Sequence, residues 1–326
     1  MKDPFFIPPI PWLSQLVQPW CDRFNLPSLP QHIHEVLLSA IFYSAIFWPV
    51  SPLLSRLLAP QHYSKLSRKR RLNWDAHVVS FIQSTLINII AIWVMIVDQE
   101  RKHMDWEERI WGYTGAAGMV QALAAGYFVW DLFVTSFNLD VFGLGTLAHA
   151  VAALLVYTLG FRPLVNYYGS VFILWELSTP FLNIHWFLDK INMTGTSVQL
   201  YNGLLLLFSF FSARLVYGTF QSFCVLRDMW AAVNTHPTKG FSQSPVMEFA
   251  TQESTVQPWL AIAYFMSNIT LNTLNFYWFI MMIRAVLKRF KPNEQRATEV
   301  EVDLSSVASG VSRASTGLQR RKQGTS

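Results

Sequence analysis

The chain has 326 residues, of which 52% are hydrophobic and only 14% are charged, and its formal net charge is +5. Soluble globular proteins carry about 25% charged residues, so this composition is typical of a membrane protein with short loops. The basic residues lie mainly beside apolar stretches or near the C-terminus, which indicates topology signals rather than a nucleic-acid-binding surface. Two cysteines, Cys21 and Cys224, exclude a disulfide scaffold and a cysteine zinc cluster, but leave a single disulfide open.

Seven apolar stretches predict an all-α, multi-pass bundle of about seven transmembrane helices, since about 20 apolar residues cross a ~30 Å hydrocarbon core. Residues 1–35 precede them and are rich in proline and aromatic residues, so we expect an irregular or interfacial segment. The predicted spans are 36–57, 77–97, 113–137, 141–160, 165–187, 200–222 and 258–284. Pro49 and Pro52 are expected to kink the first span or to end it early.

The loops predict the orientation of the bundle. Five cations fall within residues 65–71, and the positive-inside rule places that loop in the cytosol. The acidic loop 98–109 and the longer loop 224–257 are then lumenal, as is the N-terminus, and the C-terminus is cytosolic. The predicted parts of the chain are a lumenal or interfacial segment, a first span with a basic cytosolic loop, a main helical domain and a disordered cytosolic tail, over 1–35, 36–66, 67–290 and 291–326.

Polar residues inside the spans are the candidate functional residues, because lipid cannot satisfy them. From the helical rise, five of them fall roughly 9–18 Å from the cytosolic end of their spans and so form one layer. These five are Asp131, His149, Glu176, Asn272 and Asn275. We expect this layer to line a shared polar cavity inside the bundle.

Helical spacing adds further residues to the layer. Asn268, Asn272 and Asn275 share one helix face, and Thr179 and Asn183 share a face with Glu176. Arg214 lies deeper, but its long side chain is expected to reach Glu176. The predicted cavity residues are therefore Asp131, His149, Glu176, Thr179, Asn183, Arg214, Asn272 and Asn275.

Structural roles explain several of these residues equally well. Asparagines in membrane helices often only join helices, with roughly 0.6–2 kcal/mol per hydrogen bond. Glu176 and Arg214 would then be a structural ion pair, His149 a neutral buried imidazole, and Asp131 a residue facing water at a helix end.

Several short motifs carry a family resemblance. They are the segments Asn73-Trp74-Asp75-Ala-His77, Tyr127-x-x-Trp130-Asp131, Leu147-Ala-His149, Trp175-Glu176-Leu-Ser178-Thr179-Pro180-Phe-Leu-Asn183 and Asn272-x-x-Asn275-x-x-Trp278. With these motifs the chain resembles the TLC-domain family, named for TRAM, Lag and CLN proteins, over about residues 67–290. It is most similar to the fungal-type members and the small animal TLC-domain-containing proteins.

The resemblance implies a helical bundle with a central lipid-accessible cavity in the endoplasmic reticulum, and a role in lipid metabolism, transport, sensing or homeostasis. The ceramide synthases of this family transfer a fatty acyl group from acyl-CoA with adjacent histidines. Here Ala150 follows His149, so that pair is incomplete.

Three functions remain open at this point. The leading hypothesis is a protein of lipid homeostasis whose cavity binds a sphingolipid, a phospholipid or an acyl-CoA-derived lipid. The alternative is a lipid N- or O-acyltransferase that uses acyl-CoA, with His149 as general base and Asp131 as its partner. The third is a scaffold. No cofactor and no metal are expected, because phosphate-binding, nucleophile-elbow and zinc-protease motifs are missing from the sequence.

Overall fold

The computed structural model describes residues 1–290, with side chains described through Leu287, so the predicted tail 291–326 lies outside the described residues. The described part is helical and contains no strand. Its helices are α1 (Pro11–Phe24), α2 (Leu29–Ala45), η1 (Ile46–Val50), α3 (Ser51–Leu58), α4 (Pro60–Tyr63), α5 (Arg68–Val97), α6 (Gln99–Lys102), α7 (Trp106–Trp111), α8 (Gly115–Phe137), α9 (Leu139–Leu159), α10 (Asn166–Phe172), η2 (Ile173–Ser178), α11 (Thr179–Lys190), α12 (Ser197–Phe210), η3 (Phe211–Tyr217), α13 (Gly218–Val233) and α14 (Pro258–Phe290).

The all-α, multi-pass prediction is confirmed. Six helices of the described chain are long and apolar enough to cross a membrane: Leu29–Leu58, Arg68–Val97, Gly115–Phe137, Leu139–Leu159, Asn166–Lys190 and Ser197–Val233. The seventh predicted span, 258–284, coincides with the 33-residue helix α14, which carries three asparagines and is not one of these six. The protein is therefore a multi-pass membrane protein with about seven spans.

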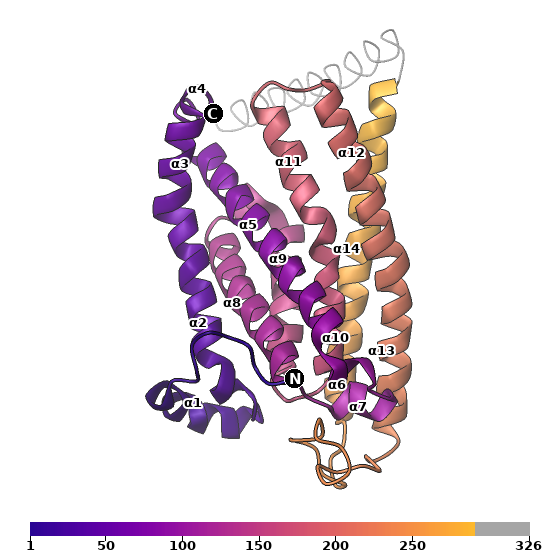
Figure 1. The fold of residues 1–326 in the computed structure, drawn as a ribbon. Coiled ribbons are helices and arrows are strands. Elements are labelled where there is room, and N and C mark those ends of the chain that lie inside the picture. The colour runs from indigo at the N-terminus through magenta and orange to yellow at the C-terminus, as the bar shows by residue number, and fades with distance from the viewer. Residues whose placement is uncertain (291–326) are drawn as a thin grey trace, which may run out of the picture. The chain divides into compact units, whose positions relative to one another are not determined.

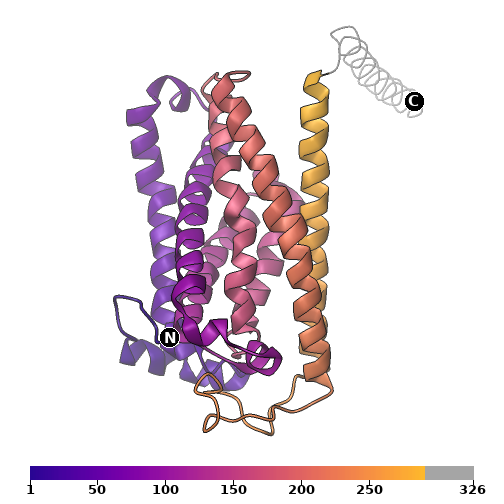
Figure 2. The ribbon, with the colours of Figure 1, turned by 45° about the vertical axis from the view of Figure 1, so that its right-hand side comes forward.

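Residues Met1–Tyr277 form one compact unit, and the end of α14 belongs to a second unit that begins at Trp278. In the first unit, α1, α6, α7 and the loop after α13 lie at one end of the bundle (Figures 1 and 2). The basic stretch that follows α4 and the turn between α11 and α12 lie at the opposite end. This alternation is the one that the predicted loops require.

Helix α8 is the buried centre of the first unit and packs against α2 and α9. Its small residues allow a neighbouring helix to approach closely. A Cβ atom on Gly126 would lie 2.3 Å from the backbone oxygen of Val36 in α2. One on Gly118 would lie 2.4 Å from Nε2 of His32 in the same helix. The side chains of α8 therefore set how closely α2 can pack.

Three spans contain irregular turns. The π-helical turn η1 contains Pro49, where the sequence predicts a kink, and the helix then continues as α3. The π-helical turn η3 interrupts the sixth span and carries Arg214. The 3₁₀ turn η2 interrupts the fifth span and carries Glu176. Turns of these kinds inside helices often coincide with functional positions.

The structure corrects three predictions. Residues 11–24 form helix α1, so of the two predicted alternatives, irregular or interfacial, the irregular one is wrong here; Pro11 lies in the first turn, at a position that needs no N–H donor. The first span begins at Leu29 rather than at residue 36. The sixth span extends to Val233, which shortens the predicted loop 224–257. Cys21 and Cys224 are both free thiols.

Candidate functional site

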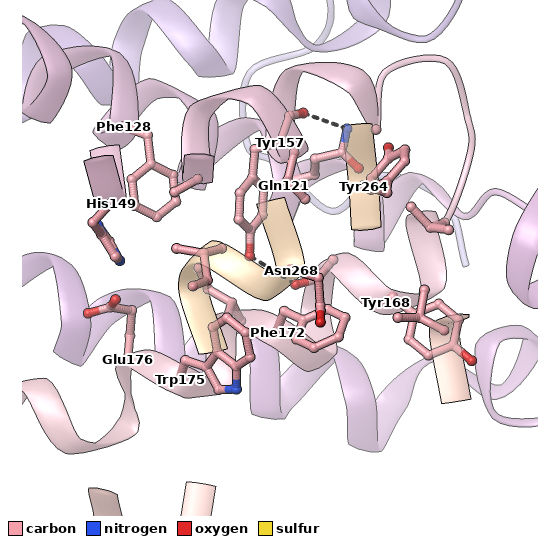
Figure 3. Close-up of a pocket in the computed structure, with 18 of the residues that line it drawn as sticks. Gln121, Phe128, His149, Tyr157, Tyr168, Phe172, Trp175, Glu176, Tyr264 and Asn268 are labelled. Carbon is pink, nitrogen blue, oxygen red and sulfur yellow. Dashed lines mark hydrogen bonds between the residues drawn. The ribbon is translucent and has the colours of Figure 1, made fainter. Parts of the chain in front are cut away.

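A pocket lies between α8, α9, α10, η2, α13 and the first half of α14 (Figure 3). Its empty volume is about 910 Å³, which includes the part open to the surroundings. The walls are mainly aromatic and aliphatic, with Phe128, Tyr157, Phe172 and Trp175 among them. Glutamine, histidine, glutamate and asparagine side chains also line it, namely Gln121, His149, Glu176 and Asn268. The pocket thus combines a large apolar surface with a few polar groups, as small-molecule and cofactor sites do.

His149 and Glu176 lie at the same end of the pocket, and their polar ends point toward each other in Figure 3. His149 comes from α9, and the ring of Phe128 on α8 contacts it edge-on with centroids 6.0 Å apart. Glu176 comes from η2 and is 9% exposed. An acid and an imidazole therefore face each other at one end of a mainly apolar pocket.

The backbone around Glu176 follows from the proline four residues later, Pro180. In an α-helix the N–H of residue 180 would bond to the carbonyl of Glu176, but Pro180 has no N–H. Thr179 N–H bonds to Glu176 O instead, which is the tighter 3₁₀ pattern. The Ser-Thr-Pro sequence thus ends one helix and starts another directly after Glu176, and so determines where this carboxylate lies.

Arg214 holds the other side of Glu176. Its Nη2 is 3.9 Å from Glu176 Oε1, as the sequence predicts, and the guanidinium is buried. It donates hydrogen bonds of 3.1 Å to Ser178 Oγ, 2.9 Å to Thr179 Oγ1 and 3.0 Å to Asn275 Oδ1. These bonds connect η3, η2, α11 and α14 and hold the guanidinium beside Glu176. The charge of Glu176 is therefore balanced inside the protein.

Tyr157 and Gln121 shape the opposite side of the pocket. Tyr157 lies two turns after His149 on the same face of α9, with Ala153 between them. Its hydroxyl donates to Gly169 O at 3.1 Å, and Gln121 Nε2 donates to Tyr157 O at 3.2 Å (Figure 3). These bonds fix the tyrosine ring as a wall between α9 and α10.

Asp131 stands beside the pocket rather than in its wall. It accepts a 3.4 Å hydrogen bond from Thr135, one turn later on α8. Asn183 is also outside the pocket. Its side chain bonds to His77 Nδ1 at 2.7 Å and to Ser80 Oγ at 3.1 Å, so it joins α11 to α5.

The span-seven asparagines serve different contacts. Asn268 lines the pocket and donates to Ser222 Oγ at 3.0 Å. Asn272 donates to the same hydroxyl, also at 3.0 Å, and to Asn268 Oδ1 at 2.9 Å. Asn275 accepts the bond from Arg214. Their common face is therefore directed at α13 and at the Arg214 network together.

Of the eight predicted cavity residues, His149 and Glu176 line the pocket. Thr179, Arg214 and Asn275 form the network behind Glu176, while Asp131, Asn183 and Asn272 make the separate contacts given above. Gln121 and Tyr157 are not among the residues that the sequence predicts for a site, and Trp175 is named there only as part of a family motif. The spacing of eight between His149 and Tyr157 is a usable signal for the tyrosine. Gln121 and Trp175 carry no such signal.

Comparison with known proteins gives a consistent result. A family model described as the TLC domain matches residues 73–284. A TLC domain-containing protein of Schizosaccharomyces pombe is 40% identical over 291 residues, which is 89% of this chain and 90% of the relative. Topoisomerase I damage affected protein 4 of Saccharomyces cerevisiae is 30% identical over 80% of this chain and 86% of its own. TLC domain-containing protein 4 of Homo sapiens is 28% identical over 56% of this chain and 69% of its own.

Proposed function

This chain belongs to the TLC domain family, which is tied to lipid metabolism, and we propose that it binds a membrane lipid in the pocket between α8, α9, η2 and α14. The protein then acts in lipid homeostasis, by binding, sensing or transporting that lipid. Its proposed location is the endoplasmic reticulum, with the N-terminus in the lumen and the basic residues 65–71 in the cytosol.

The observation that carries this proposal is the pair of His149 and Glu176 at one end of a mainly apolar pocket. A lipid has an apolar chain and a polar headgroup. The aromatic and aliphatic walls match the chain, because burying apolar surface contributes about 25 cal/mol per Å². The imidazole and the carboxylate match a headgroup that both donates and accepts hydrogen bonds, such as an amide or hydroxyl.

Arg214 supports this assignment. A carboxylate buried alone is costly, and a protein that needed only a stable core would gain more from an apolar residue at position 176. The network of Ser178, Thr179 and Asn275 holds the guanidinium in one place. Glu176 thus stays oriented toward the pocket before any ligand arrives, which lowers the ordering cost of binding.

The test is to purify the protein in mild detergent and identify the co-purifying lipids by mass spectrometry. We expect one lipid class to be enriched with the wild type and reduced at least tenfold with His149→Ala, Glu176→Gln and the pocket-filling Ala153→Phe. The matched control is His103→Ala, since His103 is exposed and outside the pocket. Equal lipid profiles in the wild type and all three pocket variants would refute the proposal.

The orientation of Glu176 toward His149 also favours a second candidate, a lipid acyltransferase. In that reaction His149 accepts the proton of a lipid amine or hydroxyl as it attacks the thioester carbon of acyl-CoA, and then gives the proton to the departing thiolate. Glu176 takes the orienting role for which the sequence analysis named Asp131. Purified protein supplied with lipid and acyl-CoA would release free CoA, and His149→Ala would lower that rate by roughly 10²–10⁴-fold. No CoA release above the variant's rate excludes the enzyme and leaves lipid binding in place.

A further inference from the structure

A second polar cluster lies away from the pocket, where the N-terminal segment meets α2 and the start of α8. Asp3, His32 and Glu35 each offer a ligand atom, and these atoms all lie within 4.8 Å of one another. His32 Nδ1 is 2.9 Å from Glu35 Oε2 and 3.5 Å from Asp3 Oδ2. His32 and Glu35 are 1% and 0% exposed. A buried imidazole and a buried carboxylate therefore meet a second, partly exposed carboxylate, that of Asp3.

His32 Nδ1 faces the two carboxylates, and the hydrogen bonds around Nε2 indicate whether Nδ1 carries a hydrogen or a lone pair. Tyr113 donates its hydroxyl hydrogen to Gln31 Oε1 at 3.4 Å. The same hydroxyl oxygen contacts His32 Nε2, so it accepts from an Nε2–H group. In this tautomer Nδ1 carries a lone pair, which points at two carboxylates. Three electron-pair donors then face one another and need a cation between them.

The charges of the cluster lead to the same requirement. Among the described residues, the ion pairs of Asp3 and Glu35 involve histidines and neither lysine nor arginine. Glu35 Oε1 is buried and accepts no hydrogen bond there. Buried carboxylates without a cation are strongly unfavourable. Either a proton or a metal ion therefore compensates this site.

The ligand types and spacing fit a metal. Zinc binds imidazole nitrogen and carboxylate oxygen at about 2.0–2.2 Å, which places the ligand atoms of a tetrahedron about 3.3–3.6 Å apart. The two distances from His32 Nδ1 are within a few tenths of an ångström of that range or inside it. Tyr113 on Nε2 matches the outer hydrogen bond that metal-binding histidines usually make.

We propose that Asp3, His32 and Glu35 bind a divalent transition-metal ion, with the ligand chemistry of Zn²⁺, and that this ion fastens the N-terminal segment to α2. The segment lies against the start of α8, since a Cβ atom on Gly115 would be 2.4 Å from the backbone nitrogen of Asp3. The ion thus joins the N-terminal segment to α2 at the end of the bundle where α8 begins. It is a structural site, separate from the pocket.

The test is the zinc content of tag-free protein in detergent, equilibrated with Zn²⁺ and freed of excess ion, by plasma mass spectrometry. We expect about one zinc per chain in the wild type and a loss of at least tenfold in Asp3→Asn and Glu35→Gln. The matched control is Glu107→Gln, which removes a buried carboxylate at the same end of the bundle and should keep the zinc. Asp3 is 25% exposed, so Asp3→Asn decides the question if Glu35→Gln does not fold.

A second readout separates a bound metal from a shared proton. EDTA should lower the thermal midpoint of the wild type and of Glu107→Gln by several degrees, because an ion that binds the folded state stabilises it. It should leave Asp3→Asn unchanged. A wild type that takes up no zinc, or an Asp3→Asn variant that takes up as much as the wild type, overturns the proposal and means that the carboxylates share a proton.

Discussion

The contact of Arg214 with Glu176 allows a quantitative prediction for Arg214→Met. The substitution keeps an apolar side chain of similar length and removes the charge and three hydrogen bonds. It leaves Glu176, 9% exposed, without its cation. Removing one partner of a buried ion pair costs about 3–5 kcal/mol, mostly because the other charge stays buried and unpaired. At 3.9 Å the attraction is about 4 kcal/mol for an effective dielectric constant near 20, which agrees with that range.

The second half of the prediction is the double variant Arg214→Met with Glu176→Gln. It removes the unpaired charge, so we expect it to be more stable than Arg214→Met alone, by about 2 kcal/mol or more. The control Asn275→Ala removes one hydrogen bond to the guanidinium and should cost only about 1 kcal/mol.

Thermal unfolding in detergent, followed by intrinsic fluorescence, is measured for the wild type, Arg214→Met, Glu176→Gln, the double variant and Asn275→Ala. About 2–4 °C per kcal/mol gives a fall of roughly 6–20 °C for Arg214→Met. Additive effects of the two substitutions would refute the reasoning, because they would mean that Glu176 does not depend on Arg214. A midpoint of Arg214→Met equal to that of the wild type would refute it as well.

Three further predictions concern packing, helix joining and pH. Gly126→Ala places a Cβ atom 2.3 Å from a backbone oxygen of α2 and should destabilise the protein by about 1–3 kcal/mol. The control Gly145→Ala has nothing within 4 Å of its Cβ and should leave the stability unchanged. The thermal midpoints of the two variants check this prediction. Asn183→Ala removes hydrogen bonds between α11 and α5 and should lower the free energy of unfolding by about 1–3 kcal/mol. It should leave the co-purifying lipid unchanged. Loss of that lipid would contradict the position of Asn183 outside the pocket. Partial burial raises the pKa of Asp105. The hydrogen bonds from Lys239 and from backbone N–H groups of α7 lower this pKa by a larger amount, so it lies below the usual value of 3.8. Since the folded-state pKa is the lower one, this contact stabilises the loop of Lys239 above about pH 4 and is lost as the pH falls through the folded-state value; hydrogen exchange of that loop should therefore rise at low pH in the wild type and be high at every pH in Asp105→Asn.

The sequence predicts the bundle well because the membrane imposes strong rules on it. Long apolar stretches have to be helices, so the spans are visible, and Pro49 marks the irregular turn in the first one. The turn η2 is not visible from apolarity, since it depends on one missing N–H donor at Pro180. Helix α1 is hidden for a similar reason, as its prolines read as breakers although Pro11 is in the first turn.

The candidate site likewise has one part that the sequence predicts and one that it does not. Asp131, His149, Glu176 and Arg214 are conspicuous because charged and imidazole groups are rare inside spans. Which of them face one another depends on the pairing of helices, and helical spacing within one span does not determine that pairing. The aromatic wall is harder still to predict, because residues such as Trp175 are common throughout apolar helices and their position acquires meaning only when α9, α10 and η2 come together.

The way in which Arg214 balances the charge of Glu176 bears on the choice between lipid binding and catalysis. Arg214 already balances the charge of Glu176, and Asn275 and Thr179 hold the guanidinium in place, so the carboxylate is positioned by the protein and not by a ligand. Such an arrangement suits a ligand that is neutral where it meets Glu176, or one that brings its own proton donor, because a second full positive charge would compete with Arg214. An amide or hydroxyl headgroup satisfies this condition, and a quaternary ammonium does not. Competition between these headgroup classes in lipid-exchange measurements therefore reads out the electrostatics of the pocket directly, and preference for the quaternary ammonium would show that Arg214 leaves Glu176 with unbalanced charge.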